Sequence, residues 1–195
     1  MDSIERSNYN VPDHFIFCLE CVTDINQTSI TPTRTNLEQL ATKYNLTSIY
    51  KSCDTIEGLE DSLNALLYRD HDFKNYEILY LVLQGQANTI CINAYYYTLE
   101  EIAELFEGKL TGKILHFANS KTLDLEPDEA QYFLDITGAK AISGYGVDAT
   151  YGNSNTLDAL FFSLFSEQDN IVDLVETLFQ KNYTLCKLLD FRLYY

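Results

Sequence analysis

Residues 113–123 read KILHFANSKTL, and this stretch decides the fold of the chain. It begins as an apolar run, Ile114 to Phe117, and then changes abruptly to small and polar residues. Gly112 stands directly before it, and Pro127 fits the first turn of a following helix. A short apolar run that is bounded by turn signals and followed by a helix is typical of a central strand in a parallel sheet.

The residues just beyond this strand are the first place to look for function. Ligands of parallel sheets bind outside the carboxyl ends of the strands, so we expect Ala118 to Lys121 to line a crevice there. A second apolar run, Glu77 to Gln86 (EILYLVLQGQ), ends in the same way with Gln84 and Gly85. The two strand ends together predict a candidate site.

Strands and helices alternate along the whole chain. Apolar runs and capping signals predict strands at 14–21, 46–52, 78–83, 89–93, 114–117, 140–143 and 191–195. They predict helices at 35–44, 54–68, 98–107, 127–137, 154–165 and 170–189. We therefore expect a three-layer α/β fold, in which a mostly parallel six-stranded sheet carries helices on both faces.

Several details of this arrangement are testable. The 114–117 strand should be central, and the last strand should be antiparallel at an edge. The 89–93 run should fold back as a small hairpin after Gln84, and 144–153 (GYGVDATYGN) reads as a Gly-rich loop. Residues 1–12 are expected to be a flexible lead, and residues 13–195 a single domain.

The composition excludes several classes of partner. The 195-residue chain is 46% hydrophobic, enough for one core, and it carries a formal net charge of −16. Nucleic acids and anionic membranes need a basic face, so neither is expected as a partner of this acidic protein. No apolar run approaches the roughly 20 residues of a membrane helix. The N-terminus lacks a signal-peptide pattern, which favours a cytoplasmic location.

The five cysteines are expected to be reduced and structural. Their odd number and their places in or beside apolar elements fit buried thiols that pack as small hydrophobes. Cys18 and Cys21 form a CxxC, but no second CxxC or histidine pair completes a zinc set. We therefore predict no metal site and no cofactor.

The order of the parts resembles one known family. A third strand that ends in X-Gly (Gln84-Gly85) precedes a hairpin and a capped helix, and a fourth strand ends in small residues. The following stretch 139–145, AKAISGY, is similar to the fifth strand and active-site loop of the same family. Over residues 13–195 the chain resembles the caspase-like cysteine peptidase fold, including its bacterial CHAT-type relatives.

The resemblance implies that both members of the catalytic dyad are replaced. Gln84 occupies the position of the family histidine, and Ser120, or Asn119 one residue earlier, occupies that of the cysteine. Glutamine is no general base, and a serine hydroxyl without an adjacent base is a poor nucleophile. The family crevice implies binding roles for Gly85, Asn119, Tyr145 and Asp148.

The resulting hypothesis is a catalytically inactive caspase-like domain that serves as a binding or regulatory module for a protein or peptide partner. One alternative is an active caspase-like or serine-type hydrolase that uses Ser120. Another is a flavodoxin-like or other α/β domain that binds a small ligand, for which we expect a sheet order that splits around the first strand and no hairpin after Gln84. His116, inside the fourth strand, reads as a hydrogen-bonded core histidine, and the Tyr95–Tyr97 run as edge packing more than as a partner surface.

Overall fold

The structure is a computed structural model that describes residues 15–26, 30–71, 73–118, 120–149, 151–168 and 170–195. Its main sheet has six strands in the order β2-β1-β3-β7-β8-β9. The first five are parallel, and β9 runs antiparallel at the edge, beside β8. The strands are β1 (Phe15–Cys21), β2 (Thr47–Cys53), β3 (Tyr76–Val82), β7 (Ile114–Ala118), β8 (Ala141–Tyr145) and β9 (Phe191–Tyr194).

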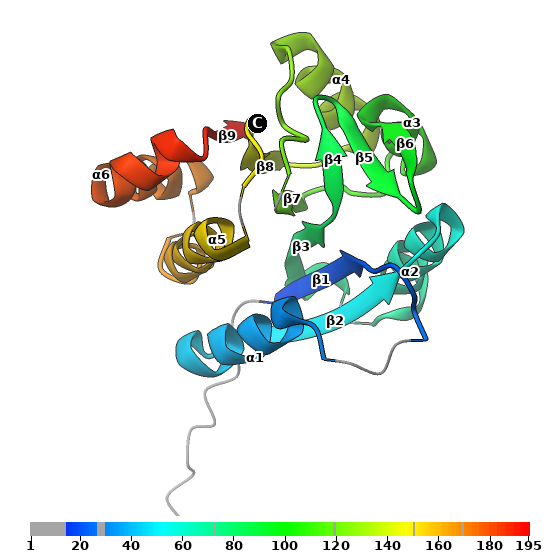
Figure 1. The fold of residues 1–195 in the computed structure, drawn as a ribbon, viewed down its shortest axis with the longest axis horizontal. Helices are drawn as coiled ribbons and strands as arrows, with labels where there is room; N and C mark the ends of the chain where they lie inside the picture. The colour runs from blue at the N-terminus through cyan, green and yellow to red at the C-terminus, as the bar shows by residue number, and fades with distance from the viewer. Residues whose placement is uncertain (1–14, 27–29, 72, 119, 150, 169) are drawn as a thin grey trace, which may run out of the picture.

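Helices cover both faces of this sheet. In Figure 1, α1, α5 and α6 lie on one side of it and α2, α3 and α4 on the other. The helices are α1 (Pro32–Tyr44), α2 (Ile56–Arg69), α3 (Leu99–Leu105), α4 (Pro127–Thr137), α5 (Tyr151–Phe165) and α6 (Ile171–Leu188), with a short 3-10 turn, η1 (Phe73–Asn75). The predicted three-layer α/β class and the interior place of the 114–117 strand are confirmed.

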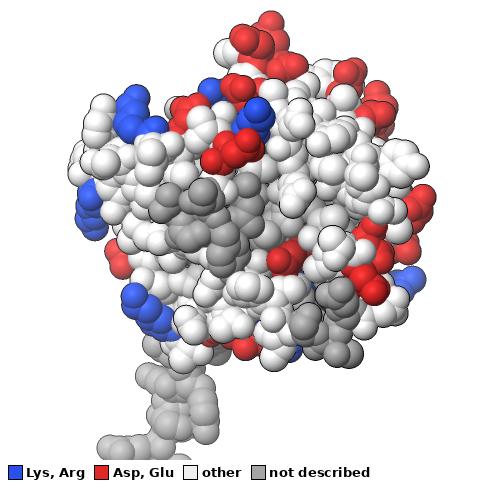
Figure 2. Space-filling view, viewed as in Figure 1, with Lys and Arg blue, Asp and Glu red and all other residues white. Residues whose placement is uncertain are grey.

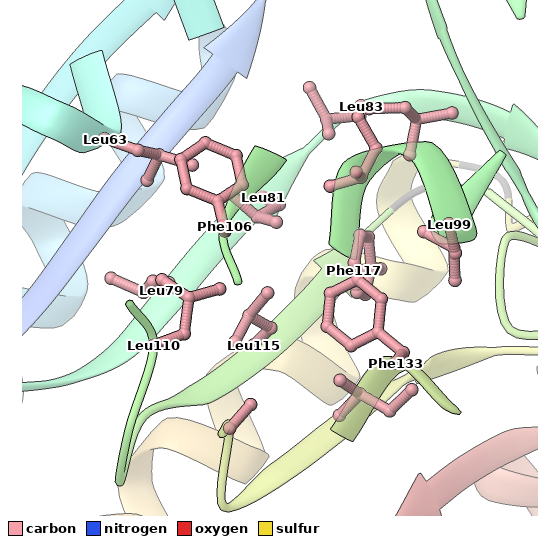
Figure 3. Packing of buried hydrophobic residues seen from close by; sticks show 14 of the residues in the cluster. Leu63, Leu79, Leu81, Leu83, Leu99, Phe106, Leu110, Leu115, Phe117 and Phe133 are labelled. Atoms are coloured by element: carbon pink, nitrogen blue, oxygen red, sulfur yellow. The ribbon is translucent and has the colours of Figure 1, made fainter. Parts of the chain in front are cut away.

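The sheet separates two hydrophobic cores because successive strand residues point to opposite faces. In β7, Leu115 and Phe117 belong to the core under α2, α3 and α4. Figure 3 shows Phe117 close to Phe133 of α4 in this core. Ile114 and Ala118 face the other core, under α1, α5 and α6. Each fully buried Leu or Phe side chain stabilises the fold by roughly 1.5–3 kcal/mol, which explains why the 113–123 stretch organises the chain.

A second, smaller antiparallel sheet follows β3 directly. It consists of β4 (Gln84–Gln86), β5 (Thr89–Ile92) and β6 (Tyr95–Thr98) in the order β4-β5-β6. The predicted hairpin after Gln84 is therefore present, with a third strand that the sequence reading did not include. The strand order splits around β1, as the flavodoxin-like alternative expected, but the hairpin, which that alternative lacks, agrees with the caspase-like order of parts.

Two element boundaries differ from the sequence prediction. Helix α1 begins at Pro32, three residues before the predicted start at Thr35, and the Thr31 hydroxyl accepts a hydrogen bond from Arg34 N at 3.2 Å. Proline is favoured at the first helical position, so Thr31 outcompetes Thr35 as the cap. The predicted loop 144–153 is also shorter, because β8 continues through Tyr145 in register with Phe191, and α5 begins at Tyr151.

Candidate functional site

The sheet reverses its winding direction between β1 and β3. These two strands are neighbours, but the chain leaves β1 towards β2 on one side and leaves β3 towards β7 on the other. The carboxyl ends of β1 and β3 therefore form a topological switch point, where α/β sheets bind ligands. A cavity of about 310 Å³ lies there. This switch-point cavity is lined by Cys21, Val22, Thr23, Gln84, Cys91, Asn93 and Ala94.

Gln84 and Ser120, the two predicted dyad positions, lie in different environments. Gln84 begins β4, is exposed and lines the switch-point cavity. Ser120 is only 3% exposed, and its Oγ lies 2.7 Å from the Thr122 hydroxyl. Thr122 donates its own hydrogen to the Thr89 carbonyl of β5 at 3.1 Å, so Ser120 is the donor to Thr122. The serine hydroxyl is therefore committed to a chain of hydrogen bonds that runs to the small sheet.

The segment that carries Ser120 is held from two sides. On the small-sheet side, Asn88 N donates to the Thr122 carbonyl at 3.2 Å. On the β9 side, Arg192 Nη1 donates to the Leu123 carbonyl at 3.0 Å, and Arg192 Nη2 lies 3.1 Å from Asp124 Oδ1. The Tyr194 hydroxyl donates to the Leu125 carbonyl at 3.3 Å. We call residues 120–126 the closed loop, since these contacts keep it against the small sheet and β9.

Gly85 allows this close approach. A Cβ atom at Gly85 would collide with the Thr89 carbonyl oxygen and with the Thr122 hydroxyl. Only a residue without a side chain lets β4 pack so tightly on the closed loop. Gly85 therefore has a structural reason that is independent of any binding role.

The other predicted binding residues are spread out. Tyr145 is fully buried at the end of β8; its hydroxyl donates to Asp158 and lies 3.3 Å from the Ser154 carbonyl oxygen. Asp148 is exposed in the turn between β8 and α5. Asn119, the second choice for the nucleophile position, lies outside the described residues. The binding roles of these residues stay predictions.

His116 lies in a buried polar network, of which the sequence predicted only the hydrogen-bonded histidine. The imidazole is 0% exposed, and its Nδ1 lies 2.9 Å from Ser143 Oγ, while its Nε2 lies 2.7 Å from Asp158 Oδ1. A neutral imidazole satisfies both contacts when Nε2 carries the hydrogen and Nδ1 accepts from Ser143. The prediction of a hydrogen-bonded core histidine is confirmed.

Asp158 is the centre of this network. Besides His116, it accepts hydrogen bonds from the Tyr80 hydroxyl at 2.7 Å and from the Tyr145 hydroxyl. Burial, and then the charge of Asp158, raise the pKa of both phenols, so both remain protonated donors. The carboxylate is 1% exposed, and its charge is stabilised by donors from three strands.

The network has the composition of a hydrolase triad but not its accessibility. Asp158, His116 and Ser143 follow one another through hydrogen bonds, as they do in serine hydrolases. His116, however, stacks on Phe161 at 5.0 Å between ring centroids and is also flanked by Phe162. Ser143 is 0% exposed, so no substrate carbonyl can reach its hydroxyl. The network therefore stabilises the core. No local sequence pattern could have linked His116 to Asp158, which lies 42 positions away.

A second cavity, of about 400 Å³, lies between α1 and α5. Tyr80 and Asp158 contribute to its wall, together with Leu37 and Leu40 of α1 and Leu160 of α5. This hollow therefore borders the buried network on the face of the sheet opposite to α2.

The described parts of the chain contain neither a metal-binding cluster nor a membrane-spanning helix. Within these residues, no group of three or more His, Cys, Asp and Glu side chains is arranged to hold a metal ion. Nor does any helix among them combine the length and the apolarity that crossing a membrane requires.

The chain thus forms a three-layer α/β domain in which the small sheet contacts the segment that follows the central strand β7. The chain belongs to a family of unknown function (DUF6642), whose model matches residues 13–195. No curated protein matches its sequence. Among solved structures it is similar to that of the Drosophila initiator caspase Dronc, with 10% sequence identity and a TM-score of 0.49 over 86% of this chain and 72% of that chain.

Proposed function

We propose that this domain is a catalytically inactive caspase-like module that binds a protein or peptide partner. The observation that supports catalytic inactivity is the environment of Ser120, a residue that is only 3% exposed and whose hydroxyl donates a hydrogen bond to Thr122. A nucleophile must be presented to its substrate and must have a base within hydrogen-bond reach. Among the described residues Ser120 has neither, because its hydrogen-bond partner is Thr122 and it is buried within the closed loop.

The general-base position supports the same conclusion. Gln84 faces the switch-point cavity, but an amide neither accepts nor returns a proton near neutral pH. The histidine of the central strand, His116, is bonded on both nitrogens within the core. It cannot replace the missing base without breaking that network.

The surface next to the crevice supports the partner half of the proposal. Tyr95 and Tyr96 of β6 are 68% and 55% exposed, which is more than edge packing requires. Tyrosine is enriched at protein interfaces, and its ring attracts cations. Exposed Glu100 and Glu101 follow at the start of α3. We call this exposed part of β6 the tyrosine face; it consists of Tyr95 and Tyr96, whose rings project to opposite sides of the strand, together with the acidic start of α3. The partner that fits it is a Lys- or Arg-containing peptide segment.

The test of inactivity uses the native chain and a Ser120→Ala variant as its matched control. Both are treated with a fluorophosphonate, which labels activated serines, and with a mixture of fluorogenic peptides. We expect no labelled peptide containing position 120 and no hydrolysis in either protein. Labelling at Ser120, or hydrolysis that disappears in Ser120→Ala, would mean that the domain is a serine-type hydrolase.

A further inference from the structure

Two cysteines end neighbouring strands of the main sheet. Cys21 is the last residue of β1, Cys53 is the last residue of β2, and the two are paired in the parallel register. Val22 N donates to the Cys53 carbonyl at 2.8 Å, so the strands stay in register up to this point. Registered residues of neighbouring strands point to the same face, and their backbones lie only ~4.8 Å apart. The two thiols are therefore neighbours.

Only one of these thiols is accessible. Cys21 is half-buried and lines the switch-point cavity, whereas Cys53 is 0% exposed and packs in the core under α2. The cavity lies where α/β sheets bind ligands. An incoming molecule therefore meets Cys21 and not Cys53, which lies beside Cys21 on β2.

The hydrogen bonding at this pair favours the thiolate of Cys21. The Cys53 thiol donates to the Cys21 sulfur and so lowers the pKa of Cys21, and a hydrogen bond from the Asn93 backbone acts in the same direction. Burial and the nearby carboxylates of Asp54 and Glu20 oppose this effect. The same hydrogen bond between the two thiols is the main cause that raises the pKa of Cys53, and burial is the second. Cys53 therefore remains the protonated partner.

We propose that Cys21 is a reactive thiol that undergoes exchange with a small disulfide entering the switch-point cavity, and that Cys53 is its resolving thiol. This site lies at the end of β1 and shares the switch-point cavity with Gln84, one of the two dyad positions of the resemblance, but its chemistry uses neither Gln84 nor Ser120. It goes beyond the proposed function and does not depend on it.

The exchange balances without any further reagent. The Cys21 thiolate attacks one sulfur of a disulfide RSSR, forms a mixed disulfide with R and releases RS⁻. Cys53 then loses its proton and attacks Cys21 Sγ, which forms the Cys21–Cys53 disulfide and releases the second RS⁻. In total the two cysteines lose two electrons and two protons, and RSSR gains them as two RSH.

The geometry allows the product. A disulfide spans Cα atoms about 4.4–6.8 Å apart, and the ~4.8 Å spacing of neighbouring strands lies within that range. Cys18, the other half of the CxxC, cannot take part, because it faces the opposite core and is 0% exposed. Burial also raises the pKa of Cys18. The expectation that every cysteine is structural thus holds for Cys18, and the proposal departs from it for Cys21 and Cys53.

Cys91 provides an internal control in the same protein. It is also half-buried and lines the same cavity, but it is paired in register with Gln84 and Tyr96 and not with a cysteine. The full-length chain is incubated with oxidised glutathione, the remaining thiols are alkylated, and peptides are mapped by mass spectrometry. We expect a Cys21–Cys53 disulfide, with Cys91 recovered in the alkylated form.

Variants at Cys53 separate its two roles. In Cys53→Ser the mixed disulfide with glutathione should persist at Cys21, because no resolving thiol remains. In Cys53→Ala, which also removes the hydrogen-bond donor, iodoacetamide labelling of Cys21 at neutral pH should slow by roughly threefold or more. Its pH–rate profile should move to higher pH.

The wild-type protein alone can overturn the proposal, so the test does not rely on the folding of the variants. If glutathione reacts with Cys91 before Cys21, the cavity gives Cys21 no advantage and the proposal is wrong. If wild type accumulates glutathione on Cys21 without the internal disulfide, Cys53 is not a resolving thiol.

Discussion

Asp158 joins side chains from four elements at a single carboxylate. It lies on α5, and it accepts hydrogen bonds from Tyr80 of β3, His116 of β7 and Tyr145 of β8. A buried carboxylate of this kind is stable only while its donors remain. The same carboxylate also borders the cavity between α1 and α5. Asp158 is therefore the residue whose replacement should most disturb the packing of α5 on the sheet.

At this scale we predict that Asp158→Asn destabilises the domain by about 3 kcal/mol. The introduced amide hydrogens would face three groups that already donate, which leaves buried polar atoms without partners. Asp148→Asn, an exposed position ten residues earlier, should change stability by less than about 0.5 kcal/mol. Urea denaturation monitored by circular dichroism measures both changes. Equal effects of the two substitutions would show that the network does not stabilise the fold.

At the scale of elements, contacts from β9 and from the small sheet together hold the closed loop in its observed position. Arg192 of β9 contributes the most contacts, since its guanidinium reaches the Leu123 carbonyl, Asp124 and Asp190. Its side chain is 26% exposed, so these bonds are partly screened by solvent. Their loss should favour opening of the closed loop by about 1–2 kcal/mol.

A thiol placed at position 120 measures this opening. In a Ser120→Cys background, we predict that iodoacetamide labels position 120 slowly and that adding Arg192→Met raises the rate roughly tenfold, as about 1.4 kcal/mol implies. Arg34→Met is the matched control, because Arg34 makes an exposed ion pair with Glu38 on α1. It should leave the rate unchanged.

The same background tests the dyad position. Once the loop is loosened, Gln84→His should raise the labelling rate again, since an imidazole beside a thiol favours the thiolate. If Gln84→His accelerates labelling equally while Arg192 is intact, the closed loop is not the barrier that keeps position 120 unreactive.

The elements were largely predictable because their signals are local. Alternating apolar runs and capping residues are properties of neighbouring residues, and they indicated the main-sheet strands, the hairpin and the Thr98 capping box of α3. The predicted start of α1 was wrong because Thr31 and Thr35 compete as N-caps, and Pro32 favours Thr31. The length of β8 depends on its pairing with β9, about 50 residues later, which no local pattern contains.

The site was less predictable because its geometry depends on contacts between residues that are remote in sequence. The strand ends that carry Gln84 and Ser120 follow from periodicity, but the closure over Ser120 depends on Arg192 and Thr89, which are remote in sequence. The Cys21–Cys53 pair depends on the register of β1 with β2. A sequence gives the order of strands more readily than their register, so the spacing of the two cysteines gave no signal.

At the scale of the whole molecule, charge is the dominant feature. The net charge is −16. Figure 2 shows acidic side chains gathered along the upper and right-hand edges of one face, where Figure 1 places α4, α3 and α2. Such an excess keeps a protein soluble but destabilises its compact state through self-repulsion. The same charge would attract the Lys- or Arg-containing segment that we propose for the tyrosine face.

The stability of the domain and its affinity for a basic peptide should therefore respond to salt in opposite directions. Raising ionic strength from about 0.01 to 0.15 M shortens the Debye length from roughly 30 to 8 Å. We predict that the thermal midpoint of the free domain rises, because self-repulsion is screened. The affinity for a fluorescent Lys/Arg-rich peptide, measured by anisotropy, should fall over the same range because the attraction is screened.

Substitutions at the tyrosine face test whether the predicted peptide binding depends on Tyr95 and Tyr96 or on overall charge alone. Replacing Tyr95 and Tyr96 together by alanine should weaken peptide binding roughly tenfold, since each cation–π contact contributes about 0.5–1 kcal/mol at an exposed site. Tyr183→Ala is the control, because Tyr183 is 61% exposed on α6. If Tyr183→Ala weakens binding as much as the double variant, the peptide is held by overall charge alone. The tyrosine face would then have no part in recognition, although the rise of the thermal midpoint with salt would remain.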